Sequence, residues 1–320
     1  MMRINKKNVA IGLMAIAILL AGCGKTNKIA EDVKDVPQTE SEESSEEPTF
    51  FVHPGVREEK VIAGDYPREW DHGSCKNIAD RTVIVSIFLS DRTYSWDEDD
   101  ENDNSQMQRE LDSLAAATDW IGSQVEEYDI STDFVYDWNE NPELKLVLSS
   151  DKDICNSEDE HLIWGIIEDN LDSNYLLEKY DADNILYMIV QNVPKNWDLD
   201  SFTWIYEEDE YPYEFTVMYQ YRKGARVGAA SYAHEILHAF GAHDLYIADE
   251  GETYVVTEQY LEHLRASGSM DIMFTVHDAN GKSTGMNILG KFTPLDAYYV
   301  GIGEEPSEVE EYGLDKSEYR

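Results

Sequence analysis

Residues 233–244, with the sequence AHEILHAFGAHD, constrain the fold more strongly than any other part of the chain. His234 and His238 are four residues apart, so on a helix their side chains lie one above the other, about 6 Å apart along the axis. The residues around them are mostly apolar, which favours a helix in the core with one polar edge. Gly241 follows three residues after His238, where a helix that ends in a left-handed turn favours glycine. The segment therefore predicts a buried helix that stops abruptly and turns back.

The same spacing suggests a metal site. Two imidazoles placed in this way can bind one zinc ion, which takes nitrogen ligands at about 2.0–2.1 Å in tetrahedral geometry. Glu235 lies beside them and is placed to take a proton from metal-bound water, whose pKa zinc lowers to about 7. The pattern H-E-x-x-H also arises by chance, so two helix histidines beside an unrelated acid are the alternative. The spacing predicts Zn²⁺ as the cofactor, with His234 and His238 as ligands and Glu235 as the general base.

The continuation of the motif resembles that of the metzincins, H-E-x-x-H-x-x-G-x-x-H, in which some branches end in Asp. Counted from His234, the eleventh position is Asp244, and His243 is one short of it. About 30 residues further on, the sequence GSMDIM resembles the methionine turn of the same family, with Met273 in the methionine position and Met270 as the alternative. The chain thus resembles metzincin-like zinc metalloproteases over roughly residues 82–301.

This resemblance implies a fold and a site. The fold would be α/β (α+β), with a mixed twisted sheet, an active-site helix, an upper subdomain at about 80–241 and a lower one at about 242–303. Asp244 would be the third zinc ligand, with His243 as the alternative. A different zincin class uses a downstream glutamate, and Glu258 stands at a matching distance, 20 residues after His238. Peptide bonds would be hydrolysed by Glu235-assisted attack of zinc-bound water.

One position departs from the family. Some metzincins place a tyrosine just after the methionine turn, as an extra ligand or a donor to the transition state, whereas Phe274 stands here. Such assistance would have to come from another residue, for example Tyr246, or from the metal alone.

The N-terminus resembles a bacterial lipoprotein signal peptide. Residues 1–8 carry three basic side chains and no acid, and the 13 residues 9–21 are all apolar or glycine. A mature membrane-spanning helix needs about 20 residues, so this run fits a signal peptide better. Leu20-Ala-Gly-Cys23 then resembles a lipobox, which implies cleavage after residue 22, lipidation of Cys23 and anchoring to the outer face of the cytoplasmic membrane. An ordinary signal peptide that ends near a cysteine is the alternative.

Acidic residues dominate the rest of the chain and set two further expectations. Residues 40–48, ESEESSEEP, cannot bury enough apolar surface to offset their ordering entropy, so residues 23–49 should form a disordered tether to a domain at 50–320. The chain has 25 basic and 66 acidic residues, a formal charge of −41, which would repel nucleic acid. The expected partners are a peptide or protein substrate and, through the lipid, the membrane, and the protein is expected to act as a monomer.

The pattern within residues 50–320 predicts strands and helices in alternation. Apolar, β-branched runs predict strands at 81–90, 144–148, 184–190 and, as an edge strand, 213–221. Helical spacing predicts helices at 105–128 and 160–180 and a short helix at Pro294, with a solvated tail from Glu304. This order predicts an α/β fold with a mixed sheet.

Two other clusters leave alternatives open. Residues 97–104, DEDDENDN, offer oxygen ligands for Ca²⁺ but lack the glycine spacing of a calcium loop, so a solvated loop is the favoured interpretation. Cys75 and Cys155 remain once Cys23 is lipidated, and outside the membrane they could form a disulfide or stay as separate buried thiols.

Two functions from different classes fit these features. The first is a cell-surface zinc-dependent endopeptidase. The second is a catalytically inactive lipoprotein of zincin fold that acts as a binding module. The intact set of His234, Glu235 and His238 favours the endopeptidase, because a decayed site usually loses one of the three. Aromatic residues such as Trp197, Trp204 and Tyr211 are candidates for the rim of the substrate cleft.

Overall fold

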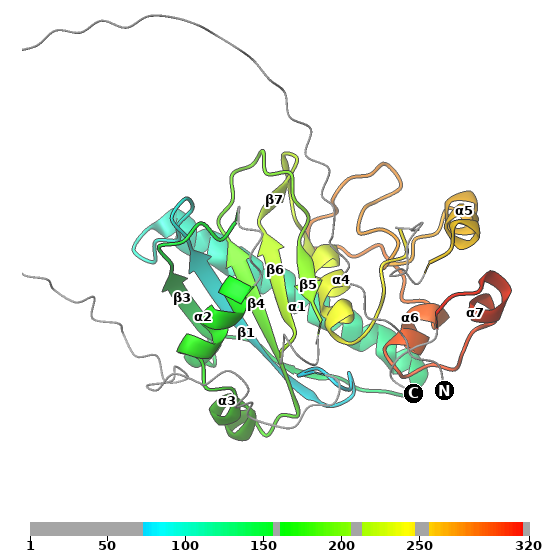
Figure 1. Cartoon of the computed structure of the whole chain (residues 1–320), viewed down its shortest axis with the longest axis horizontal. Helices are drawn as coiled ribbons and strands as arrows, with labels where there is room; N and C mark the ends of the chain where they lie inside the picture. The colour runs from blue at the N-terminus through cyan, green and yellow to red at the C-terminus, as the bar shows by residue number, and fades with distance from the viewer. Residues whose placement is uncertain (1–72, 156–160, 206–212, 247–255, 316–320) are drawn as a thin grey trace, which may run out of the picture. The chain divides into compact units, whose positions relative to one another are not determined.

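The computed structural model describes residues 73–155, 161–205, 213–246 and 256–315 (Figure 1). All of these residues belong to the second of two compact units, Phe51–Arg320. Cys23, the predicted tether at residues 23–49 and Tyr211 lie outside the described residues. None of the helices in the described part is both long and apolar enough to cross a membrane.

A mostly parallel sheet forms the centre of the fold (Figure 1). Its strands are β1 (Arg81–Ser90), β2 (Asp133–Val135), β3 (Lys145–Ser149), β4 (Asn184–Gln191), β5 (Phe202–Trp204) and β6 (Phe215–Tyr219). The order is β2-β1-β4-β6-β5, β3 also pairs with β1, and only β5 runs antiparallel to its neighbour. β1 and β4 are buried almost throughout, as expected of strands covered on both faces. The α/β class with a mixed sheet is confirmed.

Two of the strand predictions need correction. The strands at 81–90 and 184–190 are confirmed, and β3 is shifted by one residue from its expected start. The strand predicted as an edge, β6, is fully buried between β4 and β5. The edge on this side of the sheet is β5, which has only three residues and is too short to give a periodic signal.

Helices cover both faces of the sheet, with α1 behind it and α2 in front of it in Figure 1. They are α1 (Glu101–Val125), α2 (His161–Asn170), α3 (Ser173–Tyr180), α4 (Ala229–Ala239), α5 (Glu258–Ser267), α6 (Pro294–Tyr299) and α7 (Ser307–Tyr312), with 3-10 turns η1 (Glu126–Tyr128) and η2 (Pro142–Leu144). A hairpin of β7 (Tyr221–Arg222) and β8 (Ala225–Arg226) leads into α4. The single helix predicted at 160–180 is two helices, because Asp172 starts a new one by accepting a hydrogen bond from Tyr175 N–H.

The acidic run at 97–104 is not a loop throughout. The Asp100 side chain accepts hydrogen bonds from the N–H groups of Asn102 and Asp103 and so caps α1, which begins at Glu101 instead of near Ser105. Negative side chains are favourable at a helix N-terminus, where backbone N–H groups lack partners. The second half of the run therefore forms the first turn of a helix, and its carboxylates have a structural role there.

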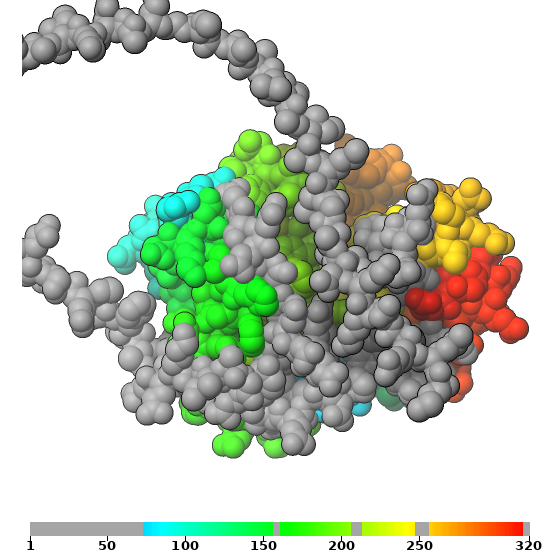
Figure 2. Space-filling model, viewed as in Figure 1, coloured from blue at the N-terminus to red at the C-terminus, as the bar shows by residue number. Residues whose placement is uncertain are grey.

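The C-terminal helices pack on one another. α6 begins after Thr293 with a capping box to Asp296, as Pro294 led us to expect. The tail, however, is not simply solvated, because it contains α7, whose Val309 is buried. Tyr312 of α7 packs against the Tyr260 ring of α5 at 5.0 Å between centroids, and the surfaces of the two helices adjoin in Figure 2.

Cys75 and Cys155 do not form a disulfide. Both are buried free thiols, and Cys75 Sγ–H donates to the carbonyl of Ile185 at 3.4 Å. The alternative of two separate buried thiols therefore holds in this structure.

Glu214 joins residues 74 and 75 to the sheet and predicts a pH dependence of stability. Its Oε2 accepts hydrogen bonds from Ser74 N–H, Ser74 Oγ–H and Cys75 N–H, and burial raises the pKa of Glu214 to about 7 from 4.5. Between pH 4.5 and 7 the folded protein keeps a proton that the unfolded chain releases, so this contribution to the free energy of unfolding is present below pH 4.5 and lost as the pH rises through 7.

We therefore expect Glu214→Gln to reduce the loss of stability between pH 4.5 and 7, by an amount of order 3 kcal/mol. Urea denaturation across this range, compared with wild type, measures the difference. Glu310→Gln, at an exposed position, is the control and should leave the pH profile unchanged. Parallel profiles for Glu214→Gln and wild type would show that Glu214 is ionised in the fold.

Candidate metal centre

The helix α4 carries His234, Glu235 and His238, and it is buried against α1, β5 and β6. Its first residue is held by a loop far along the chain, since Ala229 N–H donates to the carbonyl of Gly285 at 2.9 Å. The approach is so close that a Cβ on Gly228 would lie 2.5 Å from that oxygen, which only glycine avoids. The helix therefore has a defined position relative to residues 272–293, which follow it in sequence.

A turn at Gly241 returns the chain toward the helix. Gly241 has φ of +94°, as the sequence predicted, and its N–H donates to His238 C=O at 2.9 Å. Leu245 N–H then donates to the carbonyl of Met273 at 2.9 Å, which fixes the chain just after Asp244. Asp244 is in this way brought back beside the two histidines.

Three ligand atoms converge at this point. His234 Nε2 and His238 Nε2 are 3.0 Å apart, and Asp244 Oδ1 is 3.1 Å from each of them. A tetrahedral zinc ion with bonds of about 2.0–2.2 Å would separate its ligand atoms by about 3.3–3.6 Å, so an outward shift of a few tenths of an ångström would accommodate it. Among the described residues, this is the group of three or more His, Cys, Asp or Glu side chains that could hold a metal ion.

The other ring nitrogens show which atoms carry protons. His234 Nδ1 lies 3.0 Å from the carbonyl of Ile272, and His238 Nδ1 lies 2.7 Å from that of Ala242. A carbonyl oxygen only accepts, so each Nδ1 is the donor and, in the neutral ring, each Nε2 presents a lone pair. With both rings neutral, two lone pairs and a carboxylate oxygen face one another, an arrangement that a bound cation satisfies. The donor set fits zinc.

The electrostatics of the cluster favour a positive charge at this point. Burial opposes the charged form of His238, but its hydrogen bond to Asp244 and the charge of that carboxylate raise the pKa of His238 to about 9. Burial likewise opposes ionisation of Asp244, but hydrogen bonds from both histidines lower its pKa below the usual range. The site therefore strongly favours a positive charge, which either a proton or a metal ion can supply.

The two alternative ligands lie apart from this cluster. His243 packs edge-on against the Tyr299 ring, at 4.8 Å between centroids, and burial lowers its pKa to about 4. Glu258 is exposed at the first turn of α5. The structure thus brings together His234, His238 and Asp244, and neither His243 nor Glu258 joins them.

Residues 268–273, whose sequence resembles a methionine turn, lie against the cluster through the Ile272 backbone. Met273 is fully buried, whereas Met270 is half-buried. Ile272 N–H donates to Lys291 C=O at 2.9 Å, and the Ile272 carbonyl in turn accepts from His234. This segment therefore orients a ring of the cluster, a role that residue spacing alone did not indicate.

Glu235 is held by a residue that the sequence did not single out. Thr203 Oγ1, on the edge strand β5, lies 2.9 Å from Glu235 Oε2, 2.9 Å from the Glu235 carbonyl and 2.9 Å from Thr216 Oγ1. A hydroxyl has one proton to donate, so Thr216 can donate to Thr203 while Thr203 donates to Glu235. Burial raises the pKa of Glu235, although the nearby histidines and this hydroxyl oppose the increase. The carboxylate is therefore oriented and basic.

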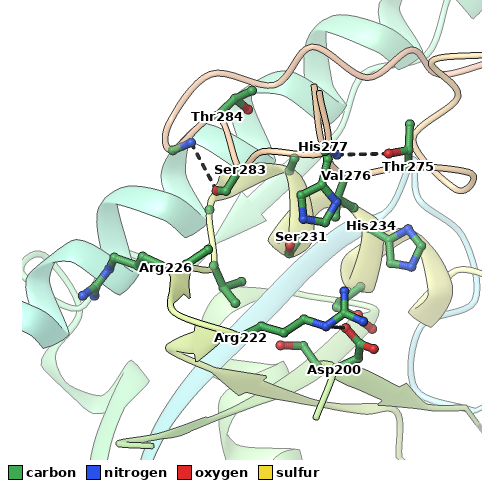
Figure 3. Close-up of a pocket in the computed structure, with 18 of the residues that line it drawn as sticks. Asp200, Arg222, Arg226, Ser231, His234, Thr275, Val276, His277, Ser283 and Thr284 are labelled. Atoms are coloured by element: carbon green, nitrogen blue, oxygen red, sulfur yellow. Dashed lines mark hydrogen bonds and ion pairs between the residues drawn. The ribbon is translucent and has the colours of Figure 1, made fainter. Parts of the chain in front are cut away.

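A cavity of about 470 Å³ opens beside these residues. Its wall includes His234, Glu235 and Tyr246, the residues just after Phe274, and the β7–β8 hairpin (Figure 3). The Tyr246 ring stacks near His234 at 6.1 Å between centroids and stays partly exposed. Trp197 is instead buried against Tyr219, so it does not form the rim. The volume lies in the range of about 300–1,000 Å³ that ligand pockets usually have.

The sequence matches no protein-family model, and a search of curated proteins found no match to it.

Proposed function

We propose that the chain is a zinc-dependent endopeptidase. The observation that carries this proposal is the convergence of His234, His238 and Asp244 with Glu235 beside them but outside the ligand triangle. A bound zinc ion would supply Lewis-acid chemistry, polarising a carbonyl and making water acidic enough to react near neutral pH. Glu235 would accept a proton from the attacking water and pass it to the departing amine.

The resemblance to metzincins gains support from the surroundings of the site. The segment that resembles a methionine turn lies beside the site, since the Ile272 carbonyl accepts a hydrogen bond from His234 and the next residue, Met273, is fully buried. Phe274 lines the cavity where some metzincins have a tyrosine, and the Tyr246 ring lies 6.1 Å from the His234 ring between centroids. In this proposal Tyr246 is the candidate donor to the developing oxyanion.

Incubation with denatured casein tests the activity. We expect cleavage that a chelator abolishes and that added Zn²⁺ restores. The metal ion, and not the His and Asp side chains themselves, would polarise the carbonyl of the substrate. Fragments that persist in the presence of chelator would point to a contaminating protease. A lack of chelator-sensitive cleavage across several unfolded proteins would favour the inactive binding lipoprotein instead.

We also propose that the mature protein is anchored at the cell surface through lipidated Cys23, as its lipobox-like sequence suggests. We expect Cys23→Ser to move the protein from the membrane fraction to the soluble fraction. Two acyl chains anchor a protein stably, and the variant would carry none. Fractionation followed by immunoblotting measures this. Equal retention of the variant and wild type in membranes would refute the anchor.

Thr203 gives a further prediction. Thr203→Val removes the hydroxyl with little change in volume, so kcat should fall about tenfold, while KM and zinc content change little. Thr203→Ser retains the hydroxyl and should keep most of the activity. Steady-state kinetics and metal analysis on the three proteins measure this. Equal kcat values for the Val and Ser variants would mean that Thr203 only fills space between β5 and α4.

A further inference from the structure

Three cationic side chains line the cavity beside α4, and each forms an ion pair with a different acidic residue. Arg226 forms an ion pair with the buried Glu110 and points away from the cavity in Figure 3. Lys223 is largely exposed and pairs with Asp198 at 3.1 Å. Arg222 instead extends across the cavity toward His234. Arg222 is therefore the cation that a ligand in this cavity would meet.

One side of the Arg222 guanidinium is occupied and the other is available. Its Nε atom is ion-paired with Asp200, whose side chain is 59% exposed, and within the described ranges neither terminal nitrogen forms a hydrogen bond. The two terminal N–H groups of an arginine match the two oxygens of a carboxylate in one plane. Asp200 thus contacts the Nε side of the guanidinium and leaves its bidentate edge open.

Neutral donors line the cavity around this edge. Thr275 Oγ1 accepts from His277 N–H at 3.2 Å and Ser283 Oγ from Gly285 N–H at 3.5 Å, so both hydroxyl protons stay available to a ligand (Figure 3). Burial and the charge of Arg222 lower the pKa of His277, which keeps this ring neutral near pH 7.

We infer that this cavity recognises an Asp or Glu side chain of the substrate, held by Arg222. The inference rests on the proposed peptidase function and names a substrate class for it. Because His234 and Glu235 belong to the same wall, the recognised side chain would lie close to the bond that is cleaved.

The acidic groups nearby do not prevent this recognition. Asp200 is exposed enough that its ion pair with Arg222 contributes little, about 0–1 kcal/mol, so a substrate carboxylate can share the guanidinium. Glu235 is engaged by Thr203. The chain has a net charge of −41, but acidic residues farther away than the Debye length, about 8 Å at physiological salt, are largely screened.

Pairs of peptides that carry Glu or Gln, at one position at a time around the cleaved bond, test the inference on the zinc-loaded full chain. We expect one position at which kcat/KM is about 10- to 100-fold higher for Glu, the effect of a charge-assisted hydrogen bond. Arg222→Ala should reduce this ratio to about one, and Arg222→Lys should retain part of it. Because both substrates meet the same preparation, partial misfolding cancels from the ratio.

Two control variants are expected to affect the Glu-to-Gln ratio of kcat/KM differently. Lys195→Ala removes a charge that lies over the Tyr221 ring outside the cavity wall, so the ratio should be unchanged. Asp200→Asn removes the competing carboxylate, so the ratio should increase. A ratio that falls equally in Lys195→Ala and Arg222→Ala would reduce the effect to general electrostatics and overturn the inference.

Binding separates this inference from the proposed function. The uncleaved Glu and Gln peptides can be titrated into the zinc-loaded Glu235→Ala protein by calorimetry, and the Glu peptide should bind about 10-fold or more tightly, unless Arg222 is also replaced. Cleavage without preference at any position would overturn the recognition of an acidic side chain but would support the peptidase activity. Tighter binding of the Glu peptide without any cleavage by wild type would support the recognition but would overturn the peptidase activity.

Discussion

Replacing Glu235 by alanine is expected to lower turnover by about 10²–10⁴-fold while the zinc content stays stoichiometric. Glu235 is buried beside the two histidines, and its carboxylate is bound by Thr203 rather than placed among the three converging atoms. It is therefore located to move a proton and not to hold the ion. Kinetics on a quenched fluorescent peptide and metal analysis of the same preparation measure the two quantities.

Glu235→Gln is the matched variant for this test. It keeps the volume of the side chain and an oxygen that can accept from Thr203, but it cannot take up a proton from water. Both variants should therefore show this large loss of turnover while their zinc content stays stoichiometric. Loss of zinc from both would make Glu235 a ligand, and full turnover in both would remove it from the mechanism.

The second large effect concerns the third ligand. Asp244→Ala is expected to weaken zinc affinity by more than the roughly 10–100-fold that the loss of an orienting, non-ligating partner costs. His243→Ala should keep most of the zinc and the activity, because the His243 ring packs on Tyr299 outside the ligand triangle. Zinc content after dialysis against a graded series of chelator concentrations compares the two proteins directly.

Three outcomes distinguish the possible roles of Asp244. A large loss for Asp244→Ala alone supports it as a ligand. A loss within 10–100-fold would instead place Asp244 as an orienting partner of the histidines. A metal-free His243→Ala beside a zinc-replete Asp244→Ala would overturn the assignment.

The parts of the fold and site that the sequence predicted depend on short-range patterns. His234 and His238 share a helix face, and Gly241 supplies the positive φ that returns Asp244, all within eleven residues. β1 and β4 were predicted because strands covered on both faces are continuously apolar. In these segments neighbouring residues determine the structure.

The parts that sequence reasoning missed depend on residues far apart in the chain. Thr203 lies in a three-residue strand and meets Glu235 only because β5 pairs with β6 beside α4. Arg222 carries no local signal that separates it from Lys223 next to it. The start of α1 was misplaced for a different reason, since Asp100 and the acids after it were interpreted as solvated charge although they cap a helix.

The hydrogen bond from His234 to the Ile272 carbonyl spans 38 residues, whereas the three converging side chains lie within eleven. A growing chain therefore contains all three converging side chains well before it contains the group that orients one of them. Until Ile272 is in place, the His234 ring is free to rotate, and any metal it captures meets a loose set of ligands. Because the polypeptide leaves the ribosome from its N-terminus, full assembly of the cluster is delayed until the segment that contains Ile272 has folded onto α4.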